Sequence, residues 1–155
     1  MAEPSHRILV IHGPNMDRLG LREPEIYGHQ DLAALDASLV ALGVRLGAHV
    51  ETVQANAEGA LVEAIHRADQ FDGLVLNPAA YTHTSVALHD ALRSISTTSI
   101  EVHLSNLYGR EGFRQTSMTA PACDGVIMGF GFDSYALALR HLVAKLDVST
   151  SESSP

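Results

Sequence analysis

The chain has 155 residues, of which 46% are hydrophobic and 18% are charged, and its formal net charge at pH 7 is −8. This size and composition predict one globular domain with a sizeable core, no run of ~20 apolar residues that could span a membrane, and no general nucleic-acid binding. The single cysteine, Cys123, excludes an internal disulfide, and the first five residues lack the pattern of a secretory signal, so a cytoplasmic protein is expected.

Apolar strands and amphipathic helices alternate along the chain. The first strand, 8–11, ends at Gly13-Pro14, and a long loop over 15–30 separates it from a helix that Asp31 caps. The remaining elements follow in chain order: strand 50–53, helix 58–68, strand 74–76, helix 85–94, strand 99–104, strand 125–128 and helix 135–146. The polar tail 148–155 is expected to be disordered.

Repeated right-handed βα units of this number predict an α/β fold. The expected architecture is a flavodoxin-like three-layer sandwich, with a five-stranded parallel sheet in the order 2-1-3-4-5 and helices on both faces. Strand order reverses between the first and third strands, and ligands of open α/β sheets bind beyond the carboxyl ends of the strands at such a point. Asn15, Asn77 and His103 each follow or end a predicted strand, so one cleft is expected to contain all three.

Four of the nine arginines fall in two loops that are expected at this edge of the sheet. Arg18 and Arg22 belong to one loop, and Arg110 and Arg114 belong to the other. A guanidinium group matches the two oxygens of a carboxylate, so this concentration predicts a small anionic substrate. The alternative is that each arginine is an ordinary solvated surface residue.

The residue types at this edge narrow the chemistry. The only lysine, Lys145, is near the end of the last helix, so catalysis through a Schiff base is not expected. The histidines lack the spacing of a metal site, although zinc bound by His12, His83 and His103 stays an alternative. Tyrosine, histidine, arginine and asparagine remain, and these suit proton transfer and stabilisation of an oxyanion without a metal or cofactor.

Short motifs occur in a fixed order over nearly the whole chain: Gly13-Pro14-Asn15, Leu19-Gly20, Arg22-Glu23-Pro24, Tyr27-Gly28, Asn77-Pro78, Thr82-His83-Thr84-Ser85, Glu101-Val102-His103, Ser105-Asn106, Arg110-Glu111 and Phe113-Arg114. In register, from about Ile8 to about Leu146, they closely resemble type II 3-dehydroquinate dehydratase. The resemblance implies that residues 1–147 form a single catalytic domain. The implied reaction removes water from 3-dehydroquinate and gives 3-dehydroshikimate through an enolate. Aromatic biosynthesis by the shikimate pathway and quinate breakdown share this reaction, so the biological role stays open.

The resemblance also implies the catalytic roles. Tyr27 would be the base that takes the proton beside the ketone, helped by the positive charge of Arg22, because a free phenol has a pKa of about 10. Asn15 would help to hold the enolate oxygen through a water. His103 would protonate the departing hydroxyl, and Glu101 would orient its ring or hold its proton.

Substrate binding and assembly follow from the same resemblance. The implied binding groups are the side chains of Asn77, His83, Asp90 and Arg114 and the backbone N–H groups of Leu104 and Ser105. Asp90 would reach the site of a neighbouring subunit, within trimers that assemble as a dodecamer of four trimers. No cofactor and no metal are implied.

The chain departs from the usual family pattern at a few positions. Family members usually have Asn at His12, glycine at one or both of Ala79 and Ala80, His near Tyr108, Ala at Gly109, an acidic residue at Gly112 and Tyr at Met118. None of these changes removes an implied catalytic residue, but the two glycines should loosen the loop that holds Arg110 and Arg114. The alternative function is a catalytically idle paralogue that binds a small carboxylate or serves as an assembly scaffold. Intact Arg22, Tyr27 and His103 count against it.

Overall fold

A five-stranded parallel sheet forms the middle layer of the fold. The computed structural model describes residues 3–21, 23–27 and 29–153, with the backbone alone at 24, 27 and 153. The strands are β1 (His6–His12), β2 (Ala48–Gln54), β3 (Gly73–Asn77), β4 (Thr98–His103) and β5 (Gly125–Met128). They lie in the order β2-β1-β3-β4-β5, which confirms the expected topology.

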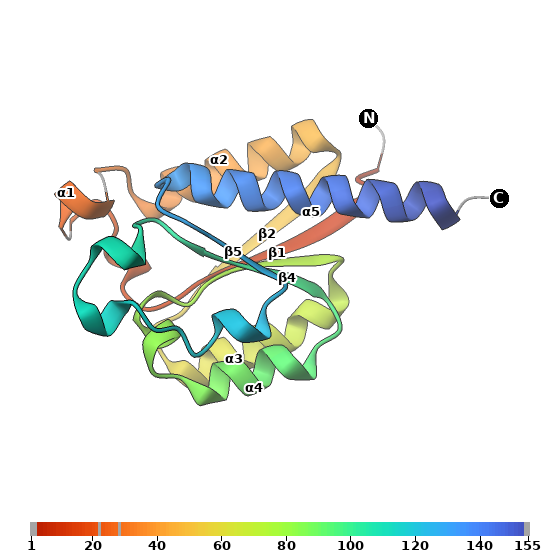
Figure 1. The fold of residues 1–155 in the computed structure, drawn as a ribbon. Helices are drawn as coiled ribbons and strands as arrows, with labels where there is room; N and C mark the ends of the chain where they lie inside the picture. The colour runs from red at the N-terminus through yellow and green to blue at the C-terminus, as the bar shows by residue number, and fades with distance from the viewer. Residues whose placement is uncertain (1–2, 22, 28, 154–155) are drawn as a thin grey trace.

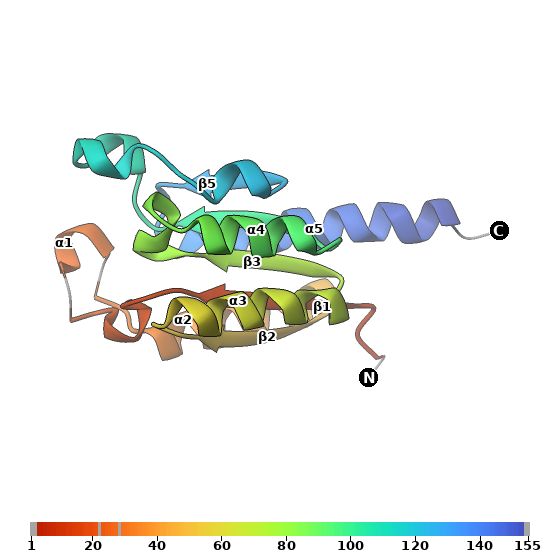
Figure 2. The same cartoon turned by 90° about the horizontal axis from the view of Figure 1, so that it is seen from below.

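Helices cover both faces of the sheet. Figure 1 shows α2 (Leu32–Leu46) and α5 (Phe132–Ser153) on one face, and α3 (Glu58–Arg67) and α4 (Val86–Ser94) on the other. Figure 2, seen from below, shows α3 and α4 side by side across the sheet. A further short helix, α1 (Pro24–Tyr27), lies within the expected long loop and stands apart from these layers, near the carboxyl ends of the strands.

The side chains of β1 alternate between two hydrophobic cores. Ile8 and Val10 pack with α2 and α5, whereas Leu9 and Ile11 pack with α3 and α4. All four are almost completely buried, because both faces of a parallel sheet are covered by helices. The side chains of the polar residues at the strand ends also alternate between the two faces of the sheet. The position of each residue in its strand therefore sets whether it faces α2 and α5 or α3 and α4.

Local signals set the helix starts near the expected positions. The Asp31 carboxylate accepts a hydrogen bond from the Ala34 N–H at 2.9 Å, as an N-cap should. The Ser85 hydroxyl caps α4 in the same way, through the Leu88 N–H at 2.9 Å. Asp31 and Ser85 therefore fix where α2 and α4 begin. Each helix begins directly after a loop that carries candidate site residues.

The C-terminal helix is longer than the sequence predicts. The tail 148–155 was expected to be disordered, but α5 continues to Ser153, and Figures 1 and 2 show it running well past the sheet. The Ser149 and Thr150 hydroxyls donate to the carbonyls of Lys145 and Leu146, at 3.2 and 2.9 Å. Extending an existing helix needs no new nucleus, so polar residues can continue a helix that is anchored by its packed part. Residues 154 and 155 lie outside the described part of the chain.

Gly43 offers a test of how closely α2 packs on β2. A Cβ atom at this position would lie 2.6 Å from Val50 Cγ2 and 3.0 Å from the Ala48 carbonyl oxygen. Alanine improves helix propensity by about 1 kcal/mol, yet we expect Gly43→Ala to lower the free energy of unfolding by about 1–3 kcal/mol because of overpacking. Gly59→Ala is the matched control, since a Cβ on this α3 residue meets no atom within 4 Å. Urea unfolding of both variants checks the prediction, and stabilisation by Gly43→Ala would contradict it.

Candidate active site

A pocket lies beyond the carboxyl ends of β1, β3 and β4. It encloses about 600 Å³ of space, part of it open to solvent. Its lining includes Asn15 from the β1 loop, Asn77 from β3 and His103 from β4, so the expectation that these three share one cleft is confirmed. The register explains this convergence, because His12 pairs with Asn77 and His103 ends the strand on the other side of β3.

His103 and Glu101 form a buried pair on β4. They are two residues apart on one strand, so their side chains point to the same face. His103 Nε2 lies 2.7 Å from Glu101 Oε2, and the side chains are 5% and 0% exposed. An ionised carboxylate can only accept hydrogen bonds, so Nε2 carries the hydrogen and Nδ1 is the ring nitrogen that stays available for other chemistry.

Hydroxyl groups hold the Glu101 carboxylate from other sides. Thr82 donates to Oε2 at 2.8 Å, Thr119 donates to Oε1, and Ser117 lies 3.4 Å from Oε2. A buried carboxylate is stable only when such partners compensate for lost hydration. Sequence reasoning noted Thr82 only as part of a motif and missed Ser117 and Thr119, because a hydroxyl residue in a loop carries no signal of what it contacts.

The β1 and β3 loops meet through backbone contacts. The Gly13 N–H donates to the Asn77 carbonyl at 2.7 Å, and a Cβ at Gly13 would lie 2.7 Å from the Pro78 carbonyl carbon and oxygen. Only glycine fits this approach. Asn15 follows in the left-handed region, with φ 69°, and its N–H donates to Asn56 Oδ1 at 2.9 Å. This conformation suits asparagine and places it in the wall of the pocket.

Asn77 is almost completely buried at the base of the pocket. Its Nδ2 donates to the Tyr135 hydroxyl at 2.9 Å, and its Oδ1 accepts from the Ala79 N–H at 2.9 Å. Nδ2 also donates to Met16 Sδ at 3.5 Å, and a thioether sulfur is a weak acceptor. A further partner can therefore use the second lone pair of Oδ1, or replace the sulfur at Nδ2. Ala79 itself has φ 51°, in the left-handed region that favours glycine.

Two of the four expected arginines line the pocket. Arg114 Nε donates to Glu111 Oε2 at 2.6 Å, and Arg110 Nη1 lies 3.4 Å from the Ser105 hydroxyl. The hydrogen bond from Arg114, with the charges of both arginines, holds the pKa of the Glu111 carboxyl below its usual value. Arg18 belongs to the loop that follows β1, as expected, but it is exposed and does not line the pocket, so the alternative of a solvated surface residue applies to it. Arg22 lies outside the described residues.

The other expected site residues divide into two groups. Leu104, Ser105 and His83 line the pocket, and His83 Nδ1 donates to the Thr116 carbonyl at 2.8 Å. Asp90 is exposed on α4 and does not line the pocket of its own chain. Tyr27 ends α1, and its side chain lies outside the described part of the chain.

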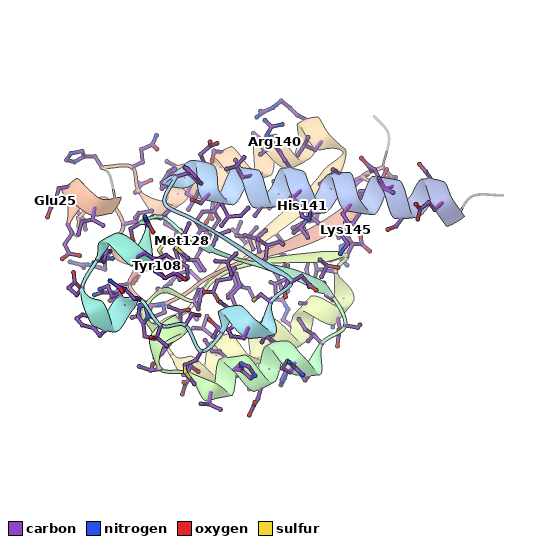
Figure 3. All side chains as sticks on the ribbon, in the orientation of Figure 1. Glu25, Tyr108, Met128, Arg140, His141 and Lys145 are labelled. Carbon is purple, nitrogen blue, oxygen red and sulfur yellow. The ribbon has the colours of Figure 1, made fainter. Side chains whose placement is uncertain are left out.

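Other reactive groups lie elsewhere. Figure 3 shows Lys145 on the half of α5 that is away from Tyr108 and the pocket end of the sheet. Burial, with the charge of Glu101 adding to it, raises the pKa of the Cys123 thiol to about 12, so this thiol is a poor nucleophile at neutral pH.

Among the described residues, no three His, Cys, Asp or Glu side chains cluster closely enough to hold a metal ion. No helix in this part of the chain is long and apolar enough to cross a membrane.

Comparison with known proteins decides the family. The family model described as dehydroquinase class II matches residues 6–143. The chain belongs to the class II dehydroquinase family. This confirms the resemblance inferred from the motifs, since the match covers most of the chain.

Individual relatives agree with this membership over most of their length. A curated 3-dehydroquinate dehydratase from Geotalea daltonii is 52% identical over 135 residues, which cover 86% of this chain and 94% of that protein. One from Synechocystis sp. is 53% identical, covering 91% and 93%. The crystal structure of type II dehydroquinase from Butyrivibrio crossotus superposes with a TM-score of 0.87 at 44% identity, covering 88% of this chain and 97% of that one.

The buried carboxylate offers a test of the site. Glu101→Gln replaces one carboxylate oxygen by an NH2 group, which then faces either Thr119 or the pair Thr82 and His103, where the carboxylate accepts hydrogen bonds. We expect it to lower the free energy of unfolding by about 1–3 kcal/mol, the cost of a buried polar group without a proper partner. Glu63→Gln, on the exposed surface of α3, is the matched control. Equal urea midpoints for the two variants would contradict the structural role of the carboxylate.

Proposed function

We propose that the protein catalyses the dehydration of 3-dehydroquinate to 3-dehydroshikimate through an enolate, with residues 1–147 as the single catalytic domain. The observation that carries the proposal is the His103–Glu101 pair at the pocket that Asn15, Asn77 and Arg114 also line. Curated relatives about 50% identical carry the name of this activity, which supports the substrate. The proposal needs neither a metal nor a Schiff base.

Tyr27 is the base in this mechanism, and Arg22 is its partner. The base removes the proton beside the ketone, and the electron pair moves onto the carbonyl oxygen to give the enolate. The phenol must lose its proton first, and the permanent charge of Arg22 favours the phenolate. Both residues belong to the loop over 15–30, which also contains α1 at the carboxyl end of the sheet.

Asn15 and His103 complete the chemistry. Asn15, acting through a water, stabilises the negative charge that develops on the enolate oxygen. When the enolate collapses, the carbon–oxygen bond of the leaving hydroxyl breaks and His103 supplies the proton that turns it into water. His103 then needs a hydrogen on Nδ1 in addition to the one that Nε2 shares with Glu101, and the Glu101 carboxylate stabilises the resulting imidazolium.

The remaining pocket residues bind the substrate. The backbone N–H groups of Leu104 and Ser105 receive the carboxylate, while Asn77, His83 and Arg114 take the hydroxyl groups. All five residues line the pocket, which supports these roles. Arg110 also lines it and brings a second positive charge to this wall, which suits an anionic substrate.

Asp90 links catalysis to assembly in this proposal. The residue is exposed on α4 and is absent from the lining of its own pocket, as a group that serves a neighbouring subunit should be. We therefore propose trimers in which Asp90 of one chain completes the site of the next, assembled as a dodecamer of four trimers. Closed symmetry repeats this contact in each site.

An absorbance assay tests the activity and the base together. Conjugated 3-dehydroshikimate absorbs in the ultraviolet much more strongly than 3-dehydroquinate, so turnover gives a rise in absorbance. We expect Tyr27→Phe to abolish turnover while ligand affinity stays within about tenfold, because the hydroxyl works mainly in the transition state. Tyr108→Phe is the control, since this tyrosine is 68% exposed and does not line the pocket. No rise with the wild-type protein would favour the idle paralogue.

Mixed assemblies test the shared site. Asp90→Ala chains and Tyr27→Phe chains are each measured alone, at a substrate concentration well below the KM of the Asp90→Ala variant. After dissociation and reassembly at equal amounts, about a quarter of the sites (one half times one half) combine an intact Tyr27 with an intact Asp90 from the neighbour. We expect activity above that of either variant alone. An active species of 16.6 kDa by light scattering, the mass of one chain, would refute the assembly and the shared site.

A further inference from the structure

A buried chain of hydrogen bonds starts at His12, the last residue of β1. Its side chain is fully buried on the face of the sheet that α2 and α5 cover. Nε2 lies 2.7 Å from Asp36 Oδ1 on α2, and Nδ1 lies 2.9 Å from the Tyr135 hydroxyl on α5. None of these three residues lines the pocket, and the proposed mechanism uses none of them.

The chain continues from Tyr135 to the pocket. The Tyr135 hydroxyl accepts a hydrogen bond from Asn77 Nδ2, and Asn77 Oδ1 accepts one from the Ala79 N–H. Asn77 lines the pocket, whereas Tyr135 is 0% exposed. Four elements, α2, β1, α5 and β3, thus contribute to one path that ends at a substrate-binding side chain.

The donors along this path have one consistent direction. Asn77 Nδ2 can only donate, so the Tyr135 oxygen accepts from it and the Tyr135 hydrogen must go to His12 Nδ1. The hydrogen of the neutral imidazole then sits on Nε2, where the Asp36 carboxylate accepts it. Burial raises the pKa of Tyr135 above its usual value, which keeps the hydrogen on the phenol at neutral pH.

The geometry points to His12 and Tyr135 as positioning residues that fix the orientation of the Asn77 amide toward the substrate. An amide can rotate by 180° and exchange its donor and acceptor edges. The Ala79 N–H and the Tyr135 oxygen together admit only one orientation, and His12 holds the Tyr135 hydroxyl in the required direction. The inference rests on the proposed function for the substrate that Asn77 binds.

Two substitutions at His12 separate positioning from mere packing. In His12→Asn, the side-chain Oδ1 takes the place of Nδ1, so the acceptor for Tyr135 is kept and the contact with Asp36 is lost. In His12→Gln, the amide Nε2 takes the place of the ring Nε2, so the contact with Asp36 is kept and the acceptor for Tyr135 is lost. His12→Asn thus removes only the contact with Asp36, and His12→Gln removes only the contact with Tyr135.

We expect His12→Gln to raise KM about tenfold with kcat within about threefold, and His12→Asn to stay near the wild-type KM. A tenfold change corresponds to the loss of one well-placed hydrogen bond, and Asn77 contributes equally in the ground and transition states if it binds a hydroxyl that does not react. Equal effects of the two variants, or an effect on kcat alone, would overturn the inference. If the wild-type protein shows no turnover, the proposed function fails instead.

Tyr135→Phe keeps the inference testable if a His12 variant does not fold. The change removes only the hydroxyl, so we expect the same rise in KM, and no further rise when it is combined with His12→Gln. A neutron structure of Tyr135→Phe gives a readout that needs no activity, because it distinguishes the amide nitrogen from the amide oxygen. We expect the Asn77 amide to rotate or to occupy two orientations, whereas an unchanged amide with unchanged KM would overturn the inference.

Discussion

The pairing of β1 with β3 is the contact on which the site depends. It brings together two strands that are far apart in the chain, at the point where strand order reverses, and its register sets His12 opposite Asn77. The loops that leave these strands then meet through the Gly13 N–H and the Asn77 carbonyl. A register shift of one residue would turn each of these side chains to the opposite face of the sheet. The geometry of the pocket is therefore a consequence of strand register more than of loop sequence.

The two polar networks at the strand ends lie on opposite faces of the sheet. Glu101 and His103 face the side of α3 and α4, where hydroxyl groups hold the carboxylate. His12 and Asn77 face the side of α2 and α5, where Tyr135 joins them. Each network is buried and hydrogen-bonded, so each holds its pocket residue in one orientation at a low local dielectric. In the proposed mechanism, His103 as the acid and Asn77 as a binding residue are thus supported by separate parts of the core.

The sequence predicts the architecture well because its signals are local. Apolar runs, Asp31 as a cap, and the breaker at Gly13-Pro14 define the elements, and their number and order define the topology. The convergence of Asn15, Asn77 and His103 follows from that topology. The hydroxyl partners of Glu101 and the path from His12 to Tyr135 could not be predicted, because they depend on side-chain directions between distant segments. The length of α5 was underestimated because polar residues beyond a packed helix give no sign of where it stops.

The close approach at Gly13 makes one side of the pocket a rigid wall. Its backbone leaves no room between the β1 and β3 loops, so neither loop can move without the other. Another part of the lining comes from a short surface segment in which Arg110 and Arg114 share Glu111, and a Cβ at Gly109 or Gly112 would meet no atom within 4 Å. A ligand of different size would have to be accommodated at that segment. Evolution of substrate range in this protein should accordingly have changed residues 107–114 more readily than the residues around Asn15 and Asn77.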